Sequence, residues 1–281
     1  MTPALLTLAR RALTGEAKVA RGSTIVVAVS GGPDSMGLLH LLARLGPELG
    51  ILVHAHGVDH GLRALAATEL DAAEAFATYI GVPFGRTTVR VARGGNLQAR
   101  ARTARYEALA NAARAVGAGA IATAHHADDR AETVLLRLMR GAGPRGLAVL
   151  PPRAPLGEEG IELVRPFIRA RRRTVSAHLQ RHGVPFASDP SNEDPRFLRT
   201  RVRRELMPLL EALSPGIVDH LVALADQLAS EGGEQASSFP LPRSSQAALA
   251  ELVRSRSTTA RVWLPGGLVV TVDPKARAGG A

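Results

Sequence analysis

One short segment constrains the fold more than any other: residues 30–35, Ser-Gly-Gly-Pro-Asp-Ser. The run before it, residues 25–29, is Ile-Val-Val-Ala-Val, which is typical of a strand buried on both faces. Between residues 36 and 45, apolar side chains recur at helical spacing. The sequence therefore predicts a buried strand, a tight glycine turn and the start of a helix.

The turn has the composition of an anion-binding site. Glycines can adopt positive φ angles and let a ligand approach the backbone, and free N–H groups at a helix start attract anions. Asp34 would repel a bound phosphate unless a cation lay between them, which favours a divalent metal such as Mg²⁺. An ordinary capped helix after a strand remains the alternative. The candidate ligand-binding residues of the turn are Ser30, Gly31, Gly32, Pro33, Asp34 and Ser35.

Strand-like and helix-like segments alternate along the chain, which predicts an α/β fold with a parallel sheet and helices on both faces. In such a sheet, ligands bind at the carboxyl ends of the strands. The turn at Ser30 and the loops at His60 and His125 all follow expected strands, so we expect a Rossmann-like nucleotide-binding domain. The expected strands are 25–29, 51–56, 83–91, 120–123 and 161–164.

A chain of 281 residues is long enough for two domains. We expect residues 1–212 to form a catalytic domain with a basic helical extension. Residues 213–281 would form a small C-terminal helical or α+β domain with a linker at 230–245, a hairpin at 260–272 and a disordered tail from 275. The helices expected at the ends of the chain lie at 4–21, 170–182, 196–213 and 214–232.

A second informative stretch follows the expected fourth strand. His125 and His126 precede Asp128, Asp129 and Glu132, and the i,i+3 and i,i+4 spacing puts the acids on one helix face. This pattern favours a pocket for a metal or an ammonium group, with His125 or His126 binding phosphate or moving a proton. Acids in a first helical turn also stabilise the helix dipole, so that interpretation stays open.

The positive charge is concentrated in one window. The chain carries a net charge of +10, and residues 165–204 contain eleven arginines against three acids. Such an excess favours an RNA surface over a solvated face. The candidate RNA-binding residues are Arg171, Arg172, Arg173, Arg199, Arg201, Arg203 and Arg204. Arg63 and Arg105 are candidate phosphate ligands, although a surface position explains an arginine equally well.

Composition excludes several classes of site. Without cysteine, the chain has no disulfides, thiolate metal sites, iron–sulfur ligands or cysteine nucleophile. No apolar stretch reaches the roughly 18 residues of a membrane span, and the N-terminus lacks a signal-peptide core. We therefore expect a cytoplasmic protein with no membrane partner.

The turn at 30–35 resembles the pyrophosphate loop (PP-loop) of the ATP pyrophosphatases, which have an adenine nucleotide α-hydrolase-like fold. With the other motifs, the chain resembles the tRNA(Ile)-lysidine synthetases. The motifs are Asp-His-Gly-Leu-Arg at 59–63, Ala-Arg-Thr-Ala-Arg-Tyr at 101–106, the stretch 125–137, Arg165-Pro166, Asp-Pro-Ser-Asn at 189–192, and 197–208. Ala124 and Arg130 depart from the family pattern, which commonly has Gly and Gln there.

The resemblance implies an ATP-dependent ligase that uses ATP and Mg²⁺, tRNA(Ile) with a CAU anticodon, and free L-lysine. ATP would adenylylate the C2 carbonyl oxygen of the wobble cytidine with release of pyrophosphate, and the ε-amine of lysine would then attack C2 and release AMP. By the same resemblance, Asp34 and Asp129 would hold Mg²⁺, Asp128 or Glu132 would bind lysine, and His125 would complete the catalytic set. Another PP-loop tRNA-modifying enzyme and a catalytically relic RNA-binding protein are the alternatives, and a homodimer is left open.

Overall fold

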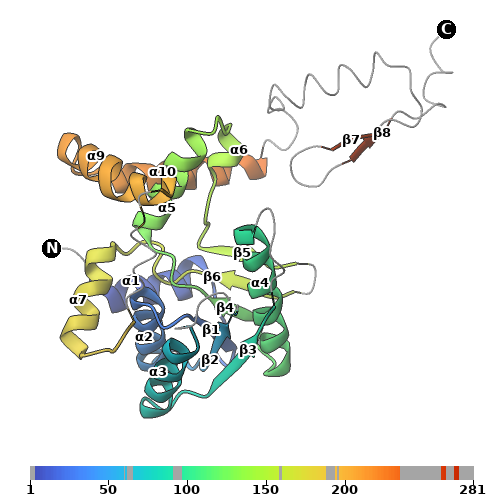
Figure 1. Ribbon diagram of the computed structural model, residues 1–281, viewed down its shortest axis with the longest axis vertical. Helices are drawn as coiled ribbons and strands as arrows, with labels where there is room; N and C mark the ends of the chain where they lie inside the picture. The colour runs from blue at the N-terminus through green and yellow to red at the C-terminus, as the bar shows by residue number, and fades with distance from the viewer. Residues whose placement is uncertain are drawn as a thin grey trace, which may run out of the picture.

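The computed structural model describes residues 4–59, 61, 66–90, 97–157, 160–187, 194, 196–234, 261–263 and 269–271. A six-stranded sheet lies at the centre, with the strand order β3-β2-β1-β4-β6-β5 (Figure 1). The strands are β1 (Thr24–Val29), β2 (Leu52–Asp59), β3 (Phe84–Thr88), β4 (Ala120–Ala122), β5 (Arg153–Pro155) and β6 (Glu162–Val164). All neighbouring pairs are parallel except β5–β6, so the predicted α/β fold is confirmed.

The helices follow the expected alternation with the strands. Those packed around the sheet are α1 (Leu5–Arg11), the π-helical turn η1 (Ala12–Glu16), α2 (Pro33–Leu49), α3 (Ala66–Tyr79), α4 (Leu97–Ala115) and α7 (Arg172–His182). Those above it are α5 (Ala127–Leu138), α6 (Pro144–Leu147), α8 (Leu198–Arg201), the π-helical turn η3 (Val202–Leu206), α9 (Met207–Leu213) and α10 (Ile217–Glu234).

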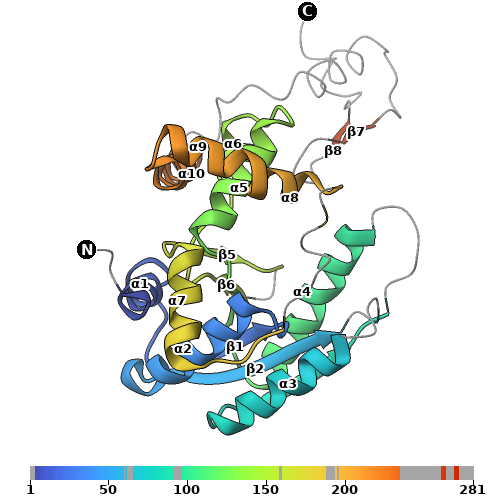
Figure 2. The same cartoon turned by 60° about the vertical axis from the view of Figure 1, so that its left-hand side comes forward.

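Strand β1 is buried on both faces because its side chains alternate between two cores. Ile25, Val27 and Val29 pack with side chains of α1, α2, α3 and α7 on one face. Val26 packs on the other face with side chains of α4 and β6. Figure 2 shows α2 and α7 on one side of the sheet and α4 on the other. The glycine turn that follows β1 therefore emerges from a strand that is buried on both faces.

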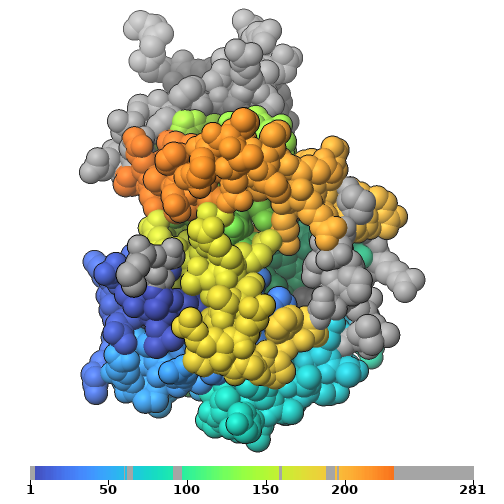
Figure 3. Space-filling view, turned by 90° about the vertical axis from the view of Figure 1, so that its left-hand side faces the viewer, coloured from blue at the N-terminus to red at the C-terminus, as the bar shows by residue number. Residues whose placement is uncertain are grey.

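A second hydrophobic core lies above the sheet, where α5 carries the chain up to α6, α9 and α10 (Figure 1). Ala131 and Val134 of α5 pack there with Val218 and Val222 of α10. Figure 3 shows α7 between this helical layer and the sheet domain. The boundary expected at residue 212 falls inside this layer, and the division into 1–212 and 213–281 stays a prediction.

Some elements differ from expectation. Strand β5 was not expected, because Pro151, Pro152 and Pro155 lack the N–H that a strand signal requires. The N-terminal helix expected at 4–21 ends at Glu16, after a switch to π-helical bonding. In the C-terminal part, β7 (Arg261–Trp263) and β8 (Val269–Thr271) form an antiparallel pair. The turn at 264–268, most of the expected linker and the tail lie outside the described residues.

Within the described ranges, no single helix is long and apolar enough to cross a membrane. The segments Leu198–Leu213 and Ile217–Ser230 meet the length and composition criterion only when taken together, and they are bent by 99°.

Candidate active site

The glycine turn is held in shape by its own hydroxyl groups. Ser35 Oγ donates to the carbonyl of Gly32 at 2.9 Å and accepts from the amide of Ser30 at 3.1 Å. Gly31 has a φ of +80°, and a Cβ there would lie 2.9 Å from the carbonyl oxygen of Glu69. Gly32 has a φ of −74° and caps α2, whose first residue is Pro33. Only Gly31 therefore uses the conformational freedom that we expected of both glycines.

A cavity of about 410 Å³ opens beside this turn. The turn contributes Ser30, Asp34 and Ser35, and α4 contributes Arg105. His125 reaches the cavity from the segment after β4. The expected meeting of the turn at Ser30 and the loop at His125 is therefore observed. Arg63 and His60 lie outside the described residues.

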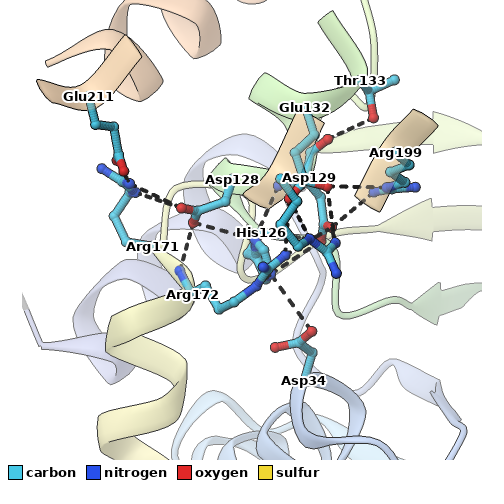
Figure 4. A network of polar contacts seen from close by, with 11 residues as sticks. Asp34, His126, Asp128, Asp129, Glu132, Thr133, Arg171, Arg172, Arg199 and Glu211 are labelled. Atoms are coloured by element: carbon cyan, nitrogen blue, oxygen red, sulfur yellow. Dashed lines mark hydrogen bonds and ion pairs between the residues drawn. The ribbon is translucent and has the colours of Figure 1, made fainter. Parts of the chain in front are cut away.

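The acidic side chains after β4 lie next to the cavity but do not line it. Of the four acidic candidates, Asp34 is a lining residue, whereas Asp128, Asp129 and Glu132 are not. These three belong to the start of α5 and point into a network of basic groups (Figure 4).

His126 connects the acids of α5 to the turn. Its Nδ1 accepts the amide hydrogen of Asp129 at 3.2 Å, while its own amide donates to Asp129 Oδ2, so the two residues cap α5 reciprocally. Its Nε2 lies 3.7 Å from Asp34 Oδ2 and 3.4 Å from Asp129 Oδ2 (Figure 4). Burial alone would lower the pKa of His126, but the nearby carboxylates of Asp34 and Asp129 raise it above its usual value. The imidazole thus lies between the two carboxylates predicted to hold a metal.

Three arginines converge on Glu132, whose side chain is 2% exposed. Arg172 reaches it from α7 at 3.2 Å and Arg199 from α8 at 3.2 Å (Figure 4). Arg203 reaches it from η3 at 2.8 Å. Arg199 also donates to Asp129 at 3.0 Å. Burial acts to raise the pKa of Asp129, and the charges of His126 and Arg199 lower it below its usual value.

Asp128 has a different environment from the other two acids. Its Oδ2 accepts the amide hydrogen of Arg172 at 2.7 Å, which caps the N-terminus of α7. Its Oδ1 accepts from Arg171 Nε at 3.1 Å, and Arg171 also pairs with Glu211 of α9. Although burial opposes it, hydrogen bonding to Arg172 and Arg171 lowers the pKa of Asp128. Both oxygens of Asp128 are thus committed to joining α5, α7 and α9.

His125 lies on the cavity side of the same segment. Its Nδ1 is 3.0 Å from the hydroxyl of Thr123. Burial lowers the pKa of His125 to about 3, and the positive charges of Arg165, Arg105 and Arg102 add to that effect. The imidazole is therefore neutral at physiological pH, which suits a hydrogen-bonding role better than that of a cationic phosphate ligand.

The predicted RNA-binding arginines fall into two groups. Arg171, Arg172, Arg199 and Arg203 form the ion pairs described above. Arg201 pairs with Glu205 on the surface, Arg173 is exposed, and Arg204 makes further contacts within the protein. The count of acids along 165–204 missed these partners because they lie outside that window: Asp128, Asp129 and Glu132 belong to α5, and Glu205 and Glu211 follow the window.

Arg130, which departs from the family pattern, does not face the cavity. It is fully buried, donates from Nε to the carbonyl of Val149, and pairs with Asp226 of α10 at 2.6 Å. Asp226 also pairs with Arg169, which reaches Glu16 of η1 at 2.7 Å. Arg130 thus ties α5 to α10.

Asp34 and Asp129 are the carboxylates that a metal could use. Within the described residues, no group of three or more His, Asp or Glu side chains is arranged to hold an ion. Mg²⁺ is commonly bound by one or two carboxylates plus phosphate oxygens. Two carboxylates facing one imidazole beside the glycine turn fit that donor set.

Comparison with known proteins agrees with the geometry. A family model described as a PP-loop domain matches residues 6–210. The chain is 42% identical to a tRNA(Ile)-lysidine synthase of Salinispora arenicola, covering 79% of this chain and 66% of that protein. It is 40% identical to the one from Symbiobacterium thermophilum, covering 75% and 44% respectively. The chain therefore spans about half to two thirds of the length of these curated relatives.

A solved structure supports the fold. The U34-tRNA thiolase NcsA of Methanococcus maripaludis superposes with a TM-score of 0.67 at 19% identity, over 80% of this chain and 78% of that one. At that identity, the likeness concerns the fold alone.

Proposed function

Because the chain belongs to the PP-loop family, we propose that it is an ATP-dependent carbon–nitrogen ligase that attaches lysine to C2 of the wobble cytidine in tRNA(Ile) with a CAU anticodon. The relatives' names support this substrate pair. The observation that carries the proposal is the position of His126, which brings Asp34 of the turn and Asp129 of α5 to one imidazole nitrogen. A nucleotide site and an acidic site thereby become neighbours.

The turn would hold the pyrophosphate end of ATP. Its N–H groups lie at the start of α2, a position that favours anions. Ser30 and Ser35 lie in the cavity wall with Asp34. Mg²⁺ held by Asp34 and Asp129 would neutralise the pyrophosphate that leaves when the C2 oxygen of cytidine attacks the α-phosphorus.

The acids on α5 would receive the lysine ammonium group. Glu132 is paired with arginine side chains, which can exchange with another cation. Asp128 is less suitable, because one oxygen caps the backbone of α7. We therefore assign the ammonium group to Glu132, and Asp129 remains a proposed Mg²⁺ ligand. A carboxylate there would accept the proton that the ε-amine loses as it attacks C2 and AMP departs with the C2 oxygen.

The RNA would approach across the arginine-rich face. The wobble nucleotide lies in a single-stranded loop, so it can enter the cavity without melting a duplex. Exposed arginines such as Arg173 are available to bind the phosphate backbone of the RNA. Arginines that pair with acids of the site, such as Arg199 and Arg203, would contact both the RNA and the site that receives lysine. These steps would take place in the cytoplasm, where tRNA is matured.

The decisive experiment combines purified protein, ATP, Mg²⁺ and transcripts of tRNA(Ile) with a CAU anticodon. We expect radiolabelled lysine to enter the RNA with stoichiometric release of AMP and pyrophosphate. A matched transcript with uridine at the wobble position should accept no lysine. Incorporation that ignores this change would contradict the proposal.

Two alternatives have distinct outcomes in the same assay. A relic RNA-binding protein would bind the transcript without releasing pyrophosphate. Another PP-loop enzyme would release pyrophosphate without any dependence on lysine. A thiolase that relies on cysteine or a cysteine-bound cluster is excluded for this chain, because its sequence contains no cysteine.

A further inference from the structure

A second groove, with a volume of about 310 Å³, borders the glycine turn. The turn contributes Gly31 to this groove, whereas Ser30 and Ser35 of the same turn line the active-site cavity. Glu69, near the start of α3, lines both. The groove and the cavity therefore share one turn and one helix as walls.

Two segments far apart in the sequence line this groove: residues 68–73 of α3, and residues 185–187, which follow α7. Both are packed directly against the turn. The amide of Ala187 donates to the carbonyl oxygen of Gly31 at 2.9 Å. On the side of α3, a Cβ on Gly31 would lie 2.9 Å from the carbonyl oxygen of Glu69. A ligand in the groove would therefore lie against the same backbone turn that we assign to the pyrophosphate.

Phe186 gives the groove an exposed aromatic ring. Its side chain is 51% exposed, whereas Phe76 and Phe167 are 9% and 0% exposed and belong to the core. Most of the other residues that line the groove are small or aliphatic, and none of the described ones is basic. The groove therefore has no donors for a phosphate. A ring beside an apolar groove suits a flat aromatic ligand, because the two can stack and bury their faces.

The groove opens on the face of the molecule that carries the arginine-rich helices. Figure 3 shows the segment 183–187 running from the end of α7 towards α3, with α8 and α9 above them. Helix α7 carries the exposed Arg173 and Arg181. An RNA bound along this face would pass the groove, and the part of the RNA that matches an apolar groove with an aromatic ring is a base.

We propose that the groove between α3 and residues 185–187 binds an unstacked base of the RNA loop, one of the two neighbours of the wobble nucleotide, stacked on Phe186. Bases in single-stranded loops can be splayed out and stacked on aromatic side chains. This inference rests on the proposed function, which brings the wobble base into the adjoining cavity and its neighbours to the turn. Phe186 would then help to place the wobble base beside ATP.

A double-mutant cycle on RNA affinity tests the stacking contact. The RNA is a stem–loop with a CAU anticodon, prepared intact and with a single base removed on the 5′ or the 3′ side of the wobble position. Phe186→Ala should weaken binding of the intact stem–loop about tenfold, as expected for the loss of one stacked base. One of the two abasic RNAs should bind the wild type about tenfold more weakly and lose no further affinity in Phe186→Ala. The abasic RNA that behaves in this way identifies the neighbour that occupies the groove.

Matched variants control for folding and for general effects of losing an aromatic ring. Phe186→Tyr keeps a ring and should bind every RNA like the wild type, whereas Phe186→Leu keeps apolar bulk without a ring and should show most of the loss. Tyr79→Ala removes a ring that is 86% exposed at the far end of α3, and it should leave RNA affinity unchanged. Affinity for a non-hydrolysable ATP analogue should be the same in all variants, because neither residue lines the cavity. Thermal unfolding verifies that each variant is folded.

Two results would overturn the groove as a base site. In one, the losses from Phe186→Ala and from each abasic RNA simply add; in the other, Phe186→Ala weakens the binding of lysine instead of RNA. Failure of the proposed function gives a different result, because the binding cycle does not depend on ligation. Wild-type protein that shows the coupling but makes no lysidine contradicts the function and supports the groove, whereas wild-type protein that binds no stem–loop overturns both.

Discussion

At the scale of single residues, four carboxylates close in space have different environments. Asp34 lines the cavity, and its carboxylate lies 3.7 Å from His126 Nε2. Asp128 is held by a backbone amide and an arginine. Asp129 and Glu132 are surrounded by arginines. The carboxylate with the fewest protein partners is the one best placed to act on a ligand.

Asp34→Ala should therefore abolish turnover while RNA affinity stays near that of the wild type. Loss of the charge that offsets the leaving pyrophosphate should slow the reaction by about 100-fold or more. Pyrophosphate release and filter binding of the transcript would be measured on the same preparation. Asp71→Ala, at an exposed surface pair of α3, serves as the control. If RNA binding disappeared together with turnover, the two sites could not be separate.

Glu132→Gln should destabilise the protein, because three arginines would lose a shared buried partner. Breaking a buried ion pair from one side costs about 3–5 kcal/mol. Glu205→Gln, which breaks the exposed Arg201–Glu205 pair, should cost less than about 1 kcal/mol. Urea unfolding of both variants gives the comparison. Equal losses of unfolding free energy in the two variants would show that the ion pairs of Glu132 do not stabilise the protein more than an exposed pair does.

At the scale of secondary structure, α7 connects the sheet domain to the active site. Its N-terminus is capped by Asp128 of α5, and its first residue, Arg172, reaches Glu132. Its buried face packs on α2 through Val175 and Leu179. A substitution that disturbs one end of α7 should therefore also shift the residues at its other end.

The cap can be tested with two substitutions at one position. Asp128→Ala removes the acceptor for the amide of Arg172 and should lower the free energy of unfolding by about 1 kcal/mol or more. Asp128→Asn keeps an oxygen acceptor and should retain most of the capping contribution. Chemical unfolding monitored by circular dichroism would measure both. Equal losses in the two variants would mean that charge, rather than capping, is what matters.

The interface between α2 and α7 should weaken in acid. His40 and His178 are 2.9 Å apart, with His182, Arg44 and Arg181 beside them and Phe76 of α3 against His40. Burial lowers the pKa of His178 to about 4, and neighbouring positive charges add to the effect; the pKa of His40 is lowered too, mainly by burial.

Because the folded-state pKa of His178 lies below the ordinary value of about 6.5, protonation favours the unfolded chain. The neutral His178 therefore contributes its full share to the free energy of unfolding above about pH 6.5, and this contribution declines as the pH falls towards 4. His178→Gln should therefore reduce the drop in melting temperature between pH 7.5 and pH 5. The exposed His220→Gln on α10 should leave that drop unchanged. A drop that is the same in all three proteins would exclude this interface as its source.

At the scale of the whole molecule, the candidate active site lies where two hydrophobic cores meet. The lower core surrounds the sheet, and the upper one joins α5, α6, α9 and α10 (Figure 1). A series of ion pairs runs from Arg130 through Asp226 and Arg169 to Glu16 and connects α10 with α5 and η1. The same α5 that enters the upper core carries the acids of the site.

Asp226→Ala should loosen this connection, because Arg130 would remain buried without a charged partner. We expect a loss of about 2 kcal/mol, below the 3–5 kcal/mol of a fully buried pair because Asp226 is partly exposed. Asp219→Ala, on the exposed face of the same helix, should change stability by less than about 0.5 kcal/mol. Thermal unfolding gives both values, and hydrogen exchange should show faster opening of α10 in Asp226→Ala alone.

Much of this architecture could be predicted from the order of the residues. The apolar run at 25–29, the glycine turn after it and the helical spacing from residue 36 depend on neighbours in the sequence, so they predicted β1, the turn and α2 correctly. Strand β5 was not predicted because the prolines in and before it are atypical of strand sequences. The approach of the turn at Ser30 to the segment at His125 followed from the rule that parallel strands end at one edge.

The partners of the charged groups depended on the tertiary structure. Glu132 meets Arg199 and Arg203 across about seventy positions, and Arg130 meets Asp226 across ninety-six. No periodicity encodes such pairs, because they form only after α7, α8 and α10 have packed. An excess of arginine along the sequence therefore predicted a charged face, while folding determined which arginines were neutralised and which stayed available for a ligand.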